Sequence, residues 1–585
     1  MKLRQIIAPY NQAVPKLIFF NIVTSLLLVL CTKGLGALSD LLLDSAGKVS
    51  VSSGDYAFVF TSWQGYVLIF LVLNLVLLYV AVEVNALIVF CGDMLDGRKP
   101  TLRRSVLEGF KAMRHYACPR GLIVIIYATL ISPLLGLGFS ISLTQSFYIP
   151  NFIRSVIDAN PLTRYALVAL LLVFLAILLL YCFLLPGVLL DGKSMKQASK
   201  DSRILVLKNL KSFLFNILSF ILGMVICYIL ALVVFIFLPL LIVNNIPMDE
   251  QLNVFFNVFF SDLGAIAFVV LQFLFSSFMI IKLLIMYRRY SSEEQWSYYP
   301  RVRKHHPVII LISVFLVLLL AAHALITSFM FDELYPPEIT TGVVAHRAGG
   351  VEAPENTVKG IEAAIALGAD GAEIDIQRTK DGYYIVNHDD TFNRVAGVNS
   401  KPSDMTLAEI KSLRVAGEQI PTLEETLEAC RDNIMLFVEL KGKTADLQMA
   451  DDAVRIIKEM GMEGQTVLIS LKFNVLDYIE RNYPEMQTGY LAFFSFGKLE
   501  KMPFDYFAVE EEIATDEAIE AIHEQNKKVM VWTVNNGSEI TRFLQSEADA
   551  IITDQVRLSE EQTETLENRT PVERIVDRTI SMFFE

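Results

Sequence analysis

Carboxylates interrupt two short apolar runs in the second half of the chain, at positions where core-facing strands normally carry branched apolar residues. These side chains are Glu373, Asp375 and Glu439. Converging carboxylates repel one another, so they need a cation between them. An all-oxygen set suits a hard divalent ion, Mg²⁺ if waters complete an octahedron and Ca²⁺ if the cage is larger. The sequence therefore predicts a divalent-metal site, with zinc less favoured because no thiolate is present.

Basic and imidazole side chains follow the same runs. Arg347 and Lys441, together with a metal ion, would make a cationic pocket that suits a phosphate group. His346 and His388 can each change charge near neutral pH, so they could serve as general base and general acid. Phosphodiester cleavage requires that set, because one group takes a proton from the attacking hydroxyl and the other protonates the leaving oxygen.

Brief apolar runs alternate with amphipathic helical stretches in this half of the chain. This alternation favours a (β/α)₈ TIM barrel, an α/β fold whose reactive groups lie at the C-terminal ends of the strands. Trp532 falls at such an end. Nine runs are candidate strands, one more than the barrel needs: Val343–Arg347, Ala372–Ile376, Tyr383–His388, Met435–Leu440, Thr466–Ser470, Thr488–Phe493, Tyr506–Val509, Val529–Val534 and Ala550–Thr553.

The extra strand is explained by a hairpin. Only residues 377–382 separate the second candidate strand from the third, too few for a crossover helix, and Asp381-Gly382 is a strong hairpin signal. A two-residue turn there makes the two strands antiparallel. It would place His388 opposite Asp375, with Glu373 one diagonal away on the same face.

Charge divides the 585 residues into two unlike parts. Residues 1–331 contain 26 Lys+Arg against 15 Asp+Glu, whereas residues 332–585 contain 24 against 48. The first part is basic and very apolar, which indicates a membrane rather than a nucleic acid as its partner. The second part is large enough to bury its own core. We expect a membrane domain at 1–331, a barrel domain at 342–560 and a C-terminal tail at 561–585.

Seven apolar stretches are long enough to cross a bilayer as helices. Connections rich in Lys and Arg alternate with connections that have at most one, and basic connections stay in the cytoplasm. This alternation predicts a multi-pass plasma-membrane protein with a cytoplasmic N-terminus and an extracellular barrel. The stretches are about 17–37, 64–92, 121–143, 164–190, 212–243, 263–287 and 307–330.

A set of motifs resembles the glycerophosphodiester phosphodiesterase family, in the family's order and over about residues 342–556. The multispanning half is similar, more loosely, to the membrane region attached to this domain in some bacterial members. The motifs are AHRAGGVEAPENT (345–357), EID (373–375), TKDG (379–382), NHDDT (387–391), PTLEE (421–425), ELK (439–441), VWTVN (531–535) and ITD (552–554).

The resemblance implies a metal-dependent TIM-barrel hydrolase that releases sn-glycerol 3-phosphate and an alcohol, with a cyclic phosphate as an intermediate. Position by position, it implies that His346 and His388 are the acid/base pair and that Glu373, Asp375 and Glu439 are the metal ligands. It makes Arg347 and Lys441 the phosphate contacts and Trp532 a platform for the glycerol or the leaving group. Glu355 and Asn356 match the family's ENT segment and would support the site.

We therefore expect an integral membrane glycerophosphodiester phosphodiesterase at the outer face of the cell membrane. Its substrates would be deacylated phospholipid head groups or, in a Gram-positive cell, poly(glycerol phosphate) teichoic acid. A strongly acidic domain repels long polyanions, which counts against the polymer. Two alternatives stay open: a phospholipase D-like action on lysophospholipids, and binding or transport of glycerophosphodiesters without turnover.

Overall fold

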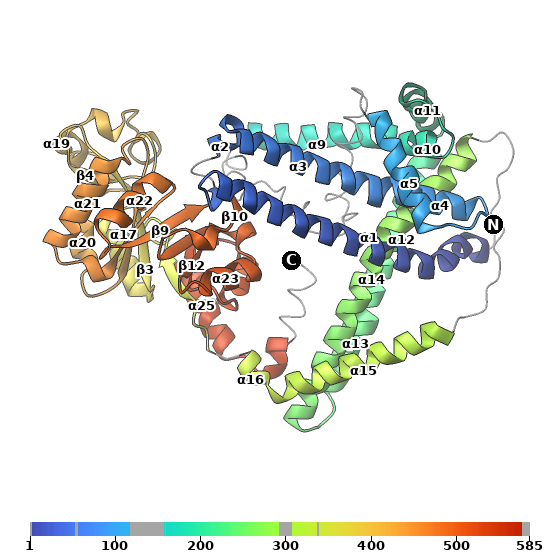
Figure 1. Ribbon diagram of the computed structural model, residues 1–585. Coiled ribbons are helices and arrows are strands. Elements are labelled where there is room, and N and C mark those ends of the chain that lie inside the picture. Colours follow the sequence, from blue (N-terminus) through green and yellow to red (C-terminus); the bar gives the residue numbers. More distant parts are fainter. Residues whose placement is uncertain are drawn as a thin grey trace.

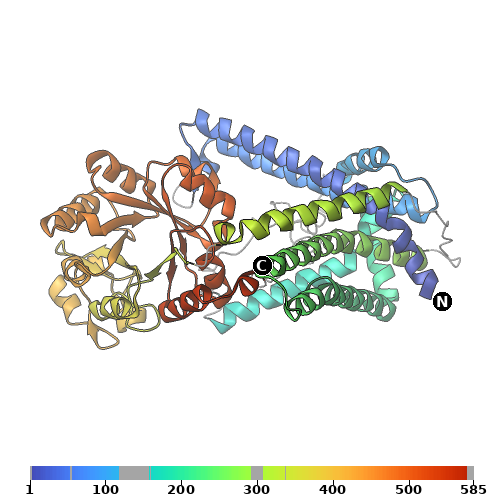
Figure 2. The same cartoon turned by 90° about the horizontal axis from the view of Figure 1, so that it is seen from below.

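The computed structural model describes residues 3–52, 56–116, 157, 160–291, 307–335 and 338–575. It consists of long apolar helices followed by an α/β barrel (Figure 1). In both views the barrel lies at one end of the helical part (Figures 1 and 2).

Five described helical segments are long and apolar enough to cross a membrane. A shorter apolar helix, Ser313–Phe329, belongs to α15 (Pro307–Phe329). Six of the seven predicted stretches coincide with these helices, and the third, 121–143, lies outside the described residues. The five segments comprise α1 (Leu3–Ser45); α3 (Trp63–Tyr79), the π-helical η1 (Val80–Asn85) and α4 (Ala86–Leu95); α9 (Pro161–Tyr181) and α10 (Leu184–Leu189); α12 (Leu210–Leu232), η4 (Val233–Phe237) and α13 (Leu238–Asn244); and α14 (Glu250–Ser291).

The sixth helix begins earlier than the sequence suggested. Residues 244–262 were expected to form a connection, but α14 already begins at Glu250. Its first turns are amphipathic, and Val254 and Val258 pack with Ala324 of α15 and with Phe331. Because this apolar face is packed, α14 extends over more residues than a helix needs to cross a bilayer. The shorter helices around these spans are α2 (Ala57–Thr61), α5 (Leu102–Ala112), α11 (Met195–Lys208) and α16 (Phe331–Leu334).

Eight parallel strands close into the predicted barrel. They follow one another around the sheet, and the pairing of β2 with β3 closes the ring. Apolar side chains such as Val344, Phe437 and Met530 form a cluster of their own, separate from the larger core that includes the outer helices. In sheet order the strands are β2 (Gly342–Ala345), β13 (Ala550–Thr553), β12 (Lys528–Trp532), β11 (Tyr506–Glu510), β9 (Gln487–Ala492), β8 (Thr466–Ser470), β7 (Met435–Leu440) and β3 (Gly371–Arg378).

Helices cover most of the barrel's outer surface, and polar side chains fix where several of them begin. Thr357, Asp446, Thr515 and Asn536 each accept a hydrogen bond from a backbone N–H in the first helical turn, and Thr422 forms a capping box with Glu425. The helices are α17 (Val358–Leu367), α20 (Leu423–Cys430), α21 (Leu447–Glu459), α22 (Phe473–Asn482), α23 (Asp516–His523), α24 (Gly537–Leu544) and α25 (Val556–Glu567).

The ninth strand, β4 (Tyr384–Val386), pairs antiparallel with the end of β3, as the hairpin signal predicts. The predicted register is wrong by one residue, because Gln377 pairs with Ile385 and the loop has three residues rather than two. Gly382 has a φ of +89°, so it supplies the left-handed residue that a three-residue hairpin loop needs. The backbone N–H of Asn387, not of His388, therefore bonds to the carbonyl of Asp375.

One crossover of the barrel has no helix. Between β9 and β11 the chain forms only the short strand β10 (Ser495–Gly497) and a single 3₁₀ turn, Leu499–Lys501. The membrane domain covers this sector: β1 (Ser50–Ser52), which follows α1, pairs antiparallel with β10 (Figure 1).

Side-chain contacts extend this pairing. The Ser52 hydroxyl hydrogen-bonds to the Tyr490 hydroxyl, and Lys498 forms an ion pair with Asp40 at 3.0 Å. Val49 packs against the barrel core. The segment after α1, which carries β1, thus covers the part of the barrel where the crossover between β9 and β11 has no α-helix.

Because Val51 lies directly opposite Phe496, cysteines at these two positions should form a disulfide in the full-length protein. Mass spectrometry of the oxidised, proteolysed protein would detect the linked peptides. The pair Val51→Cys with Ser412→Cys is the matched control and should stay unlinked. Equal linkage of both pairs would contradict the docked arrangement.

Candidate active site

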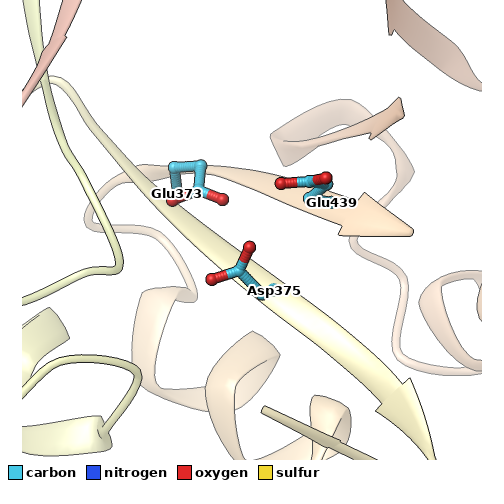
Figure 3. A group of neighbouring side chains, drawn as sticks. All are labelled: Glu373, Asp375 and Glu439. Atoms are coloured by element: carbon cyan, nitrogen blue, oxygen red, sulfur yellow. The ribbon is translucent and has the colours of Figure 1, made fainter. Parts of the chain in front are cut away.

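The three predicted metal ligands lie together on neighbouring strands (Figure 3). In the parallel register of β3 and β7, Asp375 is opposite Glu439, and Glu373 lies two residues earlier on the same face. One carboxylate oxygen from each side chain lies within 4.8 Å of the others. All three side chains are buried, so their mutual repulsion is not screened by water.

Nearby donor groups of the protein offset part of this negative charge. The Lys441 ammonium lies 2.7 Å from Asp375 Oδ1 and 2.7 Å from Glu439 Oε2. The backbone N–H of Arg347 donates to Glu373 Oε2 at 2.9 Å, and the Asn356 amide donates to Asp375 Oδ2 at 2.9 Å. A single lysine among three buried carboxylates leaves an excess of negative charge.

The pKa values reflect this excess. Burial, with the charges of Asp375 and Glu439 next in importance, raises the pKa of Glu373 well above its ordinary value. Burial also raises the pKa of Glu439 to about 7. Although burial opposes it, the charge of Lys441 holds the pKa of Asp375 below its ordinary range. An oxygen-only set in which two of the three carboxyls hold their protons this tightly fits a hard divalent cation.

His346 follows β2 and is held by a carboxylate. Its Nδ1 lies 2.7 Å from Asp554 Oδ1, and Asn535 donates from Nδ2 to Asp554 Oδ2 at 2.6 Å. Although burial opposes it, the hydrogen bond from His346 helps to hold the pKa of Asp554 below its ordinary value. A carboxylate accepts, so Nδ1 carries the proton and Nε2 is left for chemistry.

His388 has the same kind of partner. It lies just beyond β4, and its Nδ1 is 2.8 Å from Asp389 Oδ1. Burial lowers the pKa of His388, while the charge of Asp375 opposes that shift. Although the predicted hairpin register is wrong, the structure still places His388 within electrostatic reach of Asp375.

Arg347 has one donor that the described part of the chain leaves unused. Its Nη1 lies 3.2 Å from Glu355 Oε1, but its Nε is buried without a hydrogen-bond partner among the described residues. The backbone of Arg347 is left-handed, with a φ of +49°, which accompanies the turn after β2. A buried guanidinium N–H without an acceptor is costly unless a ligand supplies one.

A pocket of about 530 Å³ opens beside these groups. Its lining includes Ser470, a polar residue at the end of the fifth candidate strand, and Lys472, for which the sequence predicts no role. The Lys472 ammonium donates to the carbonyls of Gly442 and Ala445, so it braces the loop after β7. The complete lining is His388, Asp389, Asp390, Glu439, Leu440, Lys441, Gly442, Ser470, Leu471 and Lys472.

Trp532 ends β12, at the same end of the barrel. Its indole N–H donates to the carbonyl of Ala508 at 2.8 Å, which fixes the ring at the rim. Two further residues were predicted to support the site. Glu355 contacts Arg347, and Asn356 exchanges hydrogen bonds with Asp375.

Sequence reasoning gave no role to Asp389, Arg394, Asn535 or Asp554. Asp389 stands directly after His388, and Asn535 and Asp554 both fall at strand ends, so their positions were a usable signal. Arg394 lies outside every strand end, and no sequence pattern marks it.

Comparisons with known proteins agree with this architecture. Residues 346–558 match the glycerophosphoryl diester phosphodiesterase family, and residues 5–324 match the membrane domain of glycerophosphoryl diester phosphodiesterase. The fold and the site define a barrel hydrolase joined to a helical membrane domain. The second match alone spans more than half of the chain, which therefore belongs to the membrane-domain-bearing glycerophosphodiester phosphodiesterases and is a multi-pass membrane enzyme.

Individual relatives match the barrel. The glycerophosphodiester phosphodiesterase of Caldanaerobacter subterraneus subsp. tengcongensis is 31% identical over 236 residues, which is 37% of this chain and 94% of that protein. The glycerophosphodiester phosphodiesterase of Bacillus altitudinis is 28% identical over 231 residues, 37% of this chain and 94% of that protein. A phosphodiesterase from Oleispira antarctica, solved with the product sn-glycerol-3-phosphate, is 22% identical, covers 38% of this chain and 97% of its own, and has a TM-score of 0.36.

The raised pKa of Glu439 predicts a pH-dependent stability of the metal-free protein. A carboxyl whose folded pKa exceeds its ordinary value of 4.5 stabilises the fold fully below 4.5 and loses that contribution as the pH rises to about 7. In EDTA, thermal unfolding should therefore show a loss of stability across this window, to which Glu439 contributes roughly 3 kcal/mol.

Two controls make this prediction specific. Glu439→Gln should remove the share of the loss that Glu439 contributes, because the amide does not ionise, and the share of Glu373, whose pKa is also raised, should remain. Millimolar Mg²⁺ or Ca²⁺ should restore stability above pH 7, since the ion competes with protons for the same oxygens. A wild-type stability independent of pH between 4.5 and 7 would contradict the described charge distribution.

Proposed function

We propose that the barrel hydrolyses glycerophosphodiesters to sn-glycerol 3-phosphate and an alcohol at the outer face of the cell membrane. The observation that carries this proposal is the grouping of one buried carboxylate triad with two imidazoles, each held at Nδ1 by a carboxylate. That grouping combines a cation site with two proton-transfer groups, which is what cleavage of a phosphodiester needs.

The binding roles follow from the charge of each group and from the hydrogen bonds that it already makes. Glu373, Asp375 and Glu439 would hold Mg²⁺ or Ca²⁺, and the bound ion would offset negative charge on the phosphoryl oxygens. The unpartnered Nε of Arg347 donates to a phosphate oxygen. Lys441, which lies between two of the carboxylates, keeps its charge and faces the same phosphate.

The two histidines move the protons. One imidazole takes a proton at Nε2 from the substrate's 2-hydroxyl as that oxygen forms a bond to phosphorus. The other imidazolium gives a proton to the leaving alcohol oxygen as its bond to phosphorus breaks. Water then opens the cyclic phosphate with the two roles exchanged, so each histidine ends the cycle in its starting state. Asp554 and Asp389 hold the rings so that Nε2 faces the reacting atoms.

The remaining roles concern substrate and support. Trp532 forms one wall for the glycerol or the leaving group, while Glu355 and Asn356 hold Arg347 and Asp375 in place. Deacylated phospholipid head groups are the first substrates we propose, and poly(glycerol phosphate) teichoic acid is the second. A phospholipase D-like action on lysophospholipids and binding without turnover stay as alternatives, and product analysis separates all of them.

We also propose the membrane arrangement that the basic connections predict. Residues 1–331 form a membrane domain of about seven crossings in the plasma-membrane bilayer, with the N-terminus in the cytoplasm. The barrel, 342–560, is then extracellular, and 561–585 form a tail that begins within α25 (Val556–Glu567). The five long apolar segments support the multi-pass arrangement.

The histidine roles can be tested in the full-length protein with glycerophosphocholine and Mg²⁺ or Ca²⁺. His346→Ala and His388→Ala should each lower kcat at least about 100-fold, the scale of general acid–base catalysis. His523→Ala is the matched control, because His523 also pairs with an aspartate, Asp549 at 2.8 Å, but lies on outer helix α23. Its kcat should stay within about twofold of the wild type.

Two outcomes decide this proposal. Product release that survives both active-site substitutions would contradict the proton-transfer roles. A folded wild-type protein that binds glycerophosphocholine but does not cleave it would support the binding alternative instead.

Orientation can be tested by cysteine labelling of intact cells. A membrane-impermeant maleimide should label Lys401→Cys on the barrel, and it should label Lys99→Cys, in a basic connection, only after permeabilisation. Both positions are exposed, so access to each depends on the side of the membrane. The reverse labelling pattern would place the barrel in the cytoplasm.

A further inference from the structure

Arg394 binds two carboxylates at once. It lies on the single-turn helix α18 (Asn393–Ala396), in the insertion between β4 and α20. Its Nη1 and Nη2 donate to the two oxygens of Glu355 at 2.7 and 2.6 Å. Its Nε and Nη2 donate to the two oxygens of Asp389 at 2.8 and 3.1 Å. Both edges of the planar guanidinium are therefore used.

Each of these carboxylates touches a residue of the proposed reaction. Glu355 Oε1 also accepts from Nη1 of Arg347 at 3.2 Å. Asp389 Oδ1 also lies 2.8 Å from Nδ1 of His388. A continuous chain of charge-assisted hydrogen bonds thus runs from Arg347 through Arg394 to His388.

The second histidine has an equivalent support built from different residues. His346 pairs with Asp554, and Asp554 is held by the amide of Asn535 and by its own backbone N–H, which donates to Asn535 Oδ1 at 2.8 Å. In both cases the imidazole is hydrogen-bonded to a carboxylate, and a further donor fixes the orientation of that carboxylate. Arg394 is that donor for His388.

Only an arginine suits this position. Two bidentate carboxylate contacts, one through Nη1 and Nη2 and one through Nε and Nη2, require a rigid fork of N–H groups, whereas a lysine ammonium is a single point charge on a flexible chain. Although burial opposes it, Arg394 also helps to hold the pKa values of Glu355 and Asp389 below their ordinary range, so both remain acceptors.

We propose that Arg394 is a positioning residue that holds His388 and Arg347 in their reacting orientations through Asp389 and Glu355. This inference rests on the proposed function of the same site. The side chain is 49% exposed, so its removal opens no buried cavity and the barrel should remain folded.

The first test measures turnover of glycerophosphocholine by the full-length protein. Arg394→Ala should lower kcat about 10- to 100-fold, as is typical for residues that orient catalytic groups. KM should change much less than kcat, and Arg394→Lys should recover only a small part of the loss. The midpoints of the pH–kcat profile should also shift, since the environment of His388 changes.

Arg455 provides the matched control. It also pairs with two carboxylates, Glu459 at 3.1 Å and Asp452 at 3.4 Å, but it lies on outer helix α21. Arg455→Ala should leave kcat and the pH profile unchanged. Added guanidinium ion should restore activity to Arg394→Ala and should not affect Arg455→Ala, a response that a merely unstable variant would not give.

A mutant cycle tests whether Arg394 acts on kcat through Glu355 and Asp389. In a Glu355→Gln/Asp389→Asn background, the further change Arg394→Ala should cost less than about twofold in kcat, because its partners are already altered. A full 10- to 100-fold loss in that background would overturn the proposal. So would a wild-type kcat in the folded single variant.

The same experiment distinguishes this inference from the proposed function. If the wild type turns over glycerophosphocholine and Arg394→Ala matches it, only the positioning role fails. If the folded wild type has no turnover, the proposed function fails, and the positioning role fails with it.

Discussion

Mutual repulsion among three buried carboxylates is the constraint on which the rest of the site depends. The register of β3 and β7 places Glu373, Asp375 and Glu439 within 4.8 Å of one another, and burial removes the water that would screen them. Lys441 offsets only part of that charge. The fold bears this cost at one place in the barrel, and this is the place where we propose that a divalent cation, and with it a phosphate group, binds.

The second organising feature is a layer of carboxylates around the two histidines and Arg347. Asp554 and Asp389 hold the two histidines, and Glu355 holds Arg347. Although burial opposes it, the pKa values of these carboxylates lie below their ordinary values, because His346 and Asn535 donate to Asp554 and Arg394 donates to Asp389 and Glu355. Part of the barrel's acidity therefore lies within the site, where these carboxylates fix the tautomers of the two histidines and the side-chain direction of Arg347.

The local pattern of apolar and polar residues predicts most of the strands and site residues. The other features depend on contacts between segments that are distant in the sequence. The alternating apolar runs locate all nine strands of the barrel sheet, and strand ends locate the residues that gather at one end of the barrel, because the parallel fold brings such ends together. The hairpin register was wrong since Gly382 adopts a left-handed conformation and lengthens the loop by one residue. Arg394 and the pairing of β1 with β10 depend on contacts between distant segments, which no local pattern encodes.

The account depends most directly on cation binding by the carboxylate triad. Electron paramagnetic resonance of added Mn²⁺, with the full-length protein at pH 7.5, would count the bound ions without requiring turnover. The account predicts a bound ion that Mg²⁺ or Ca²⁺ displaces and that disappears in Glu373→Gln/Asp375→Asn, with binding retained in His523→Ala. Unchanged Mn²⁺ binding after loss of those carboxylates, or no binding by the folded wild type, would contradict it.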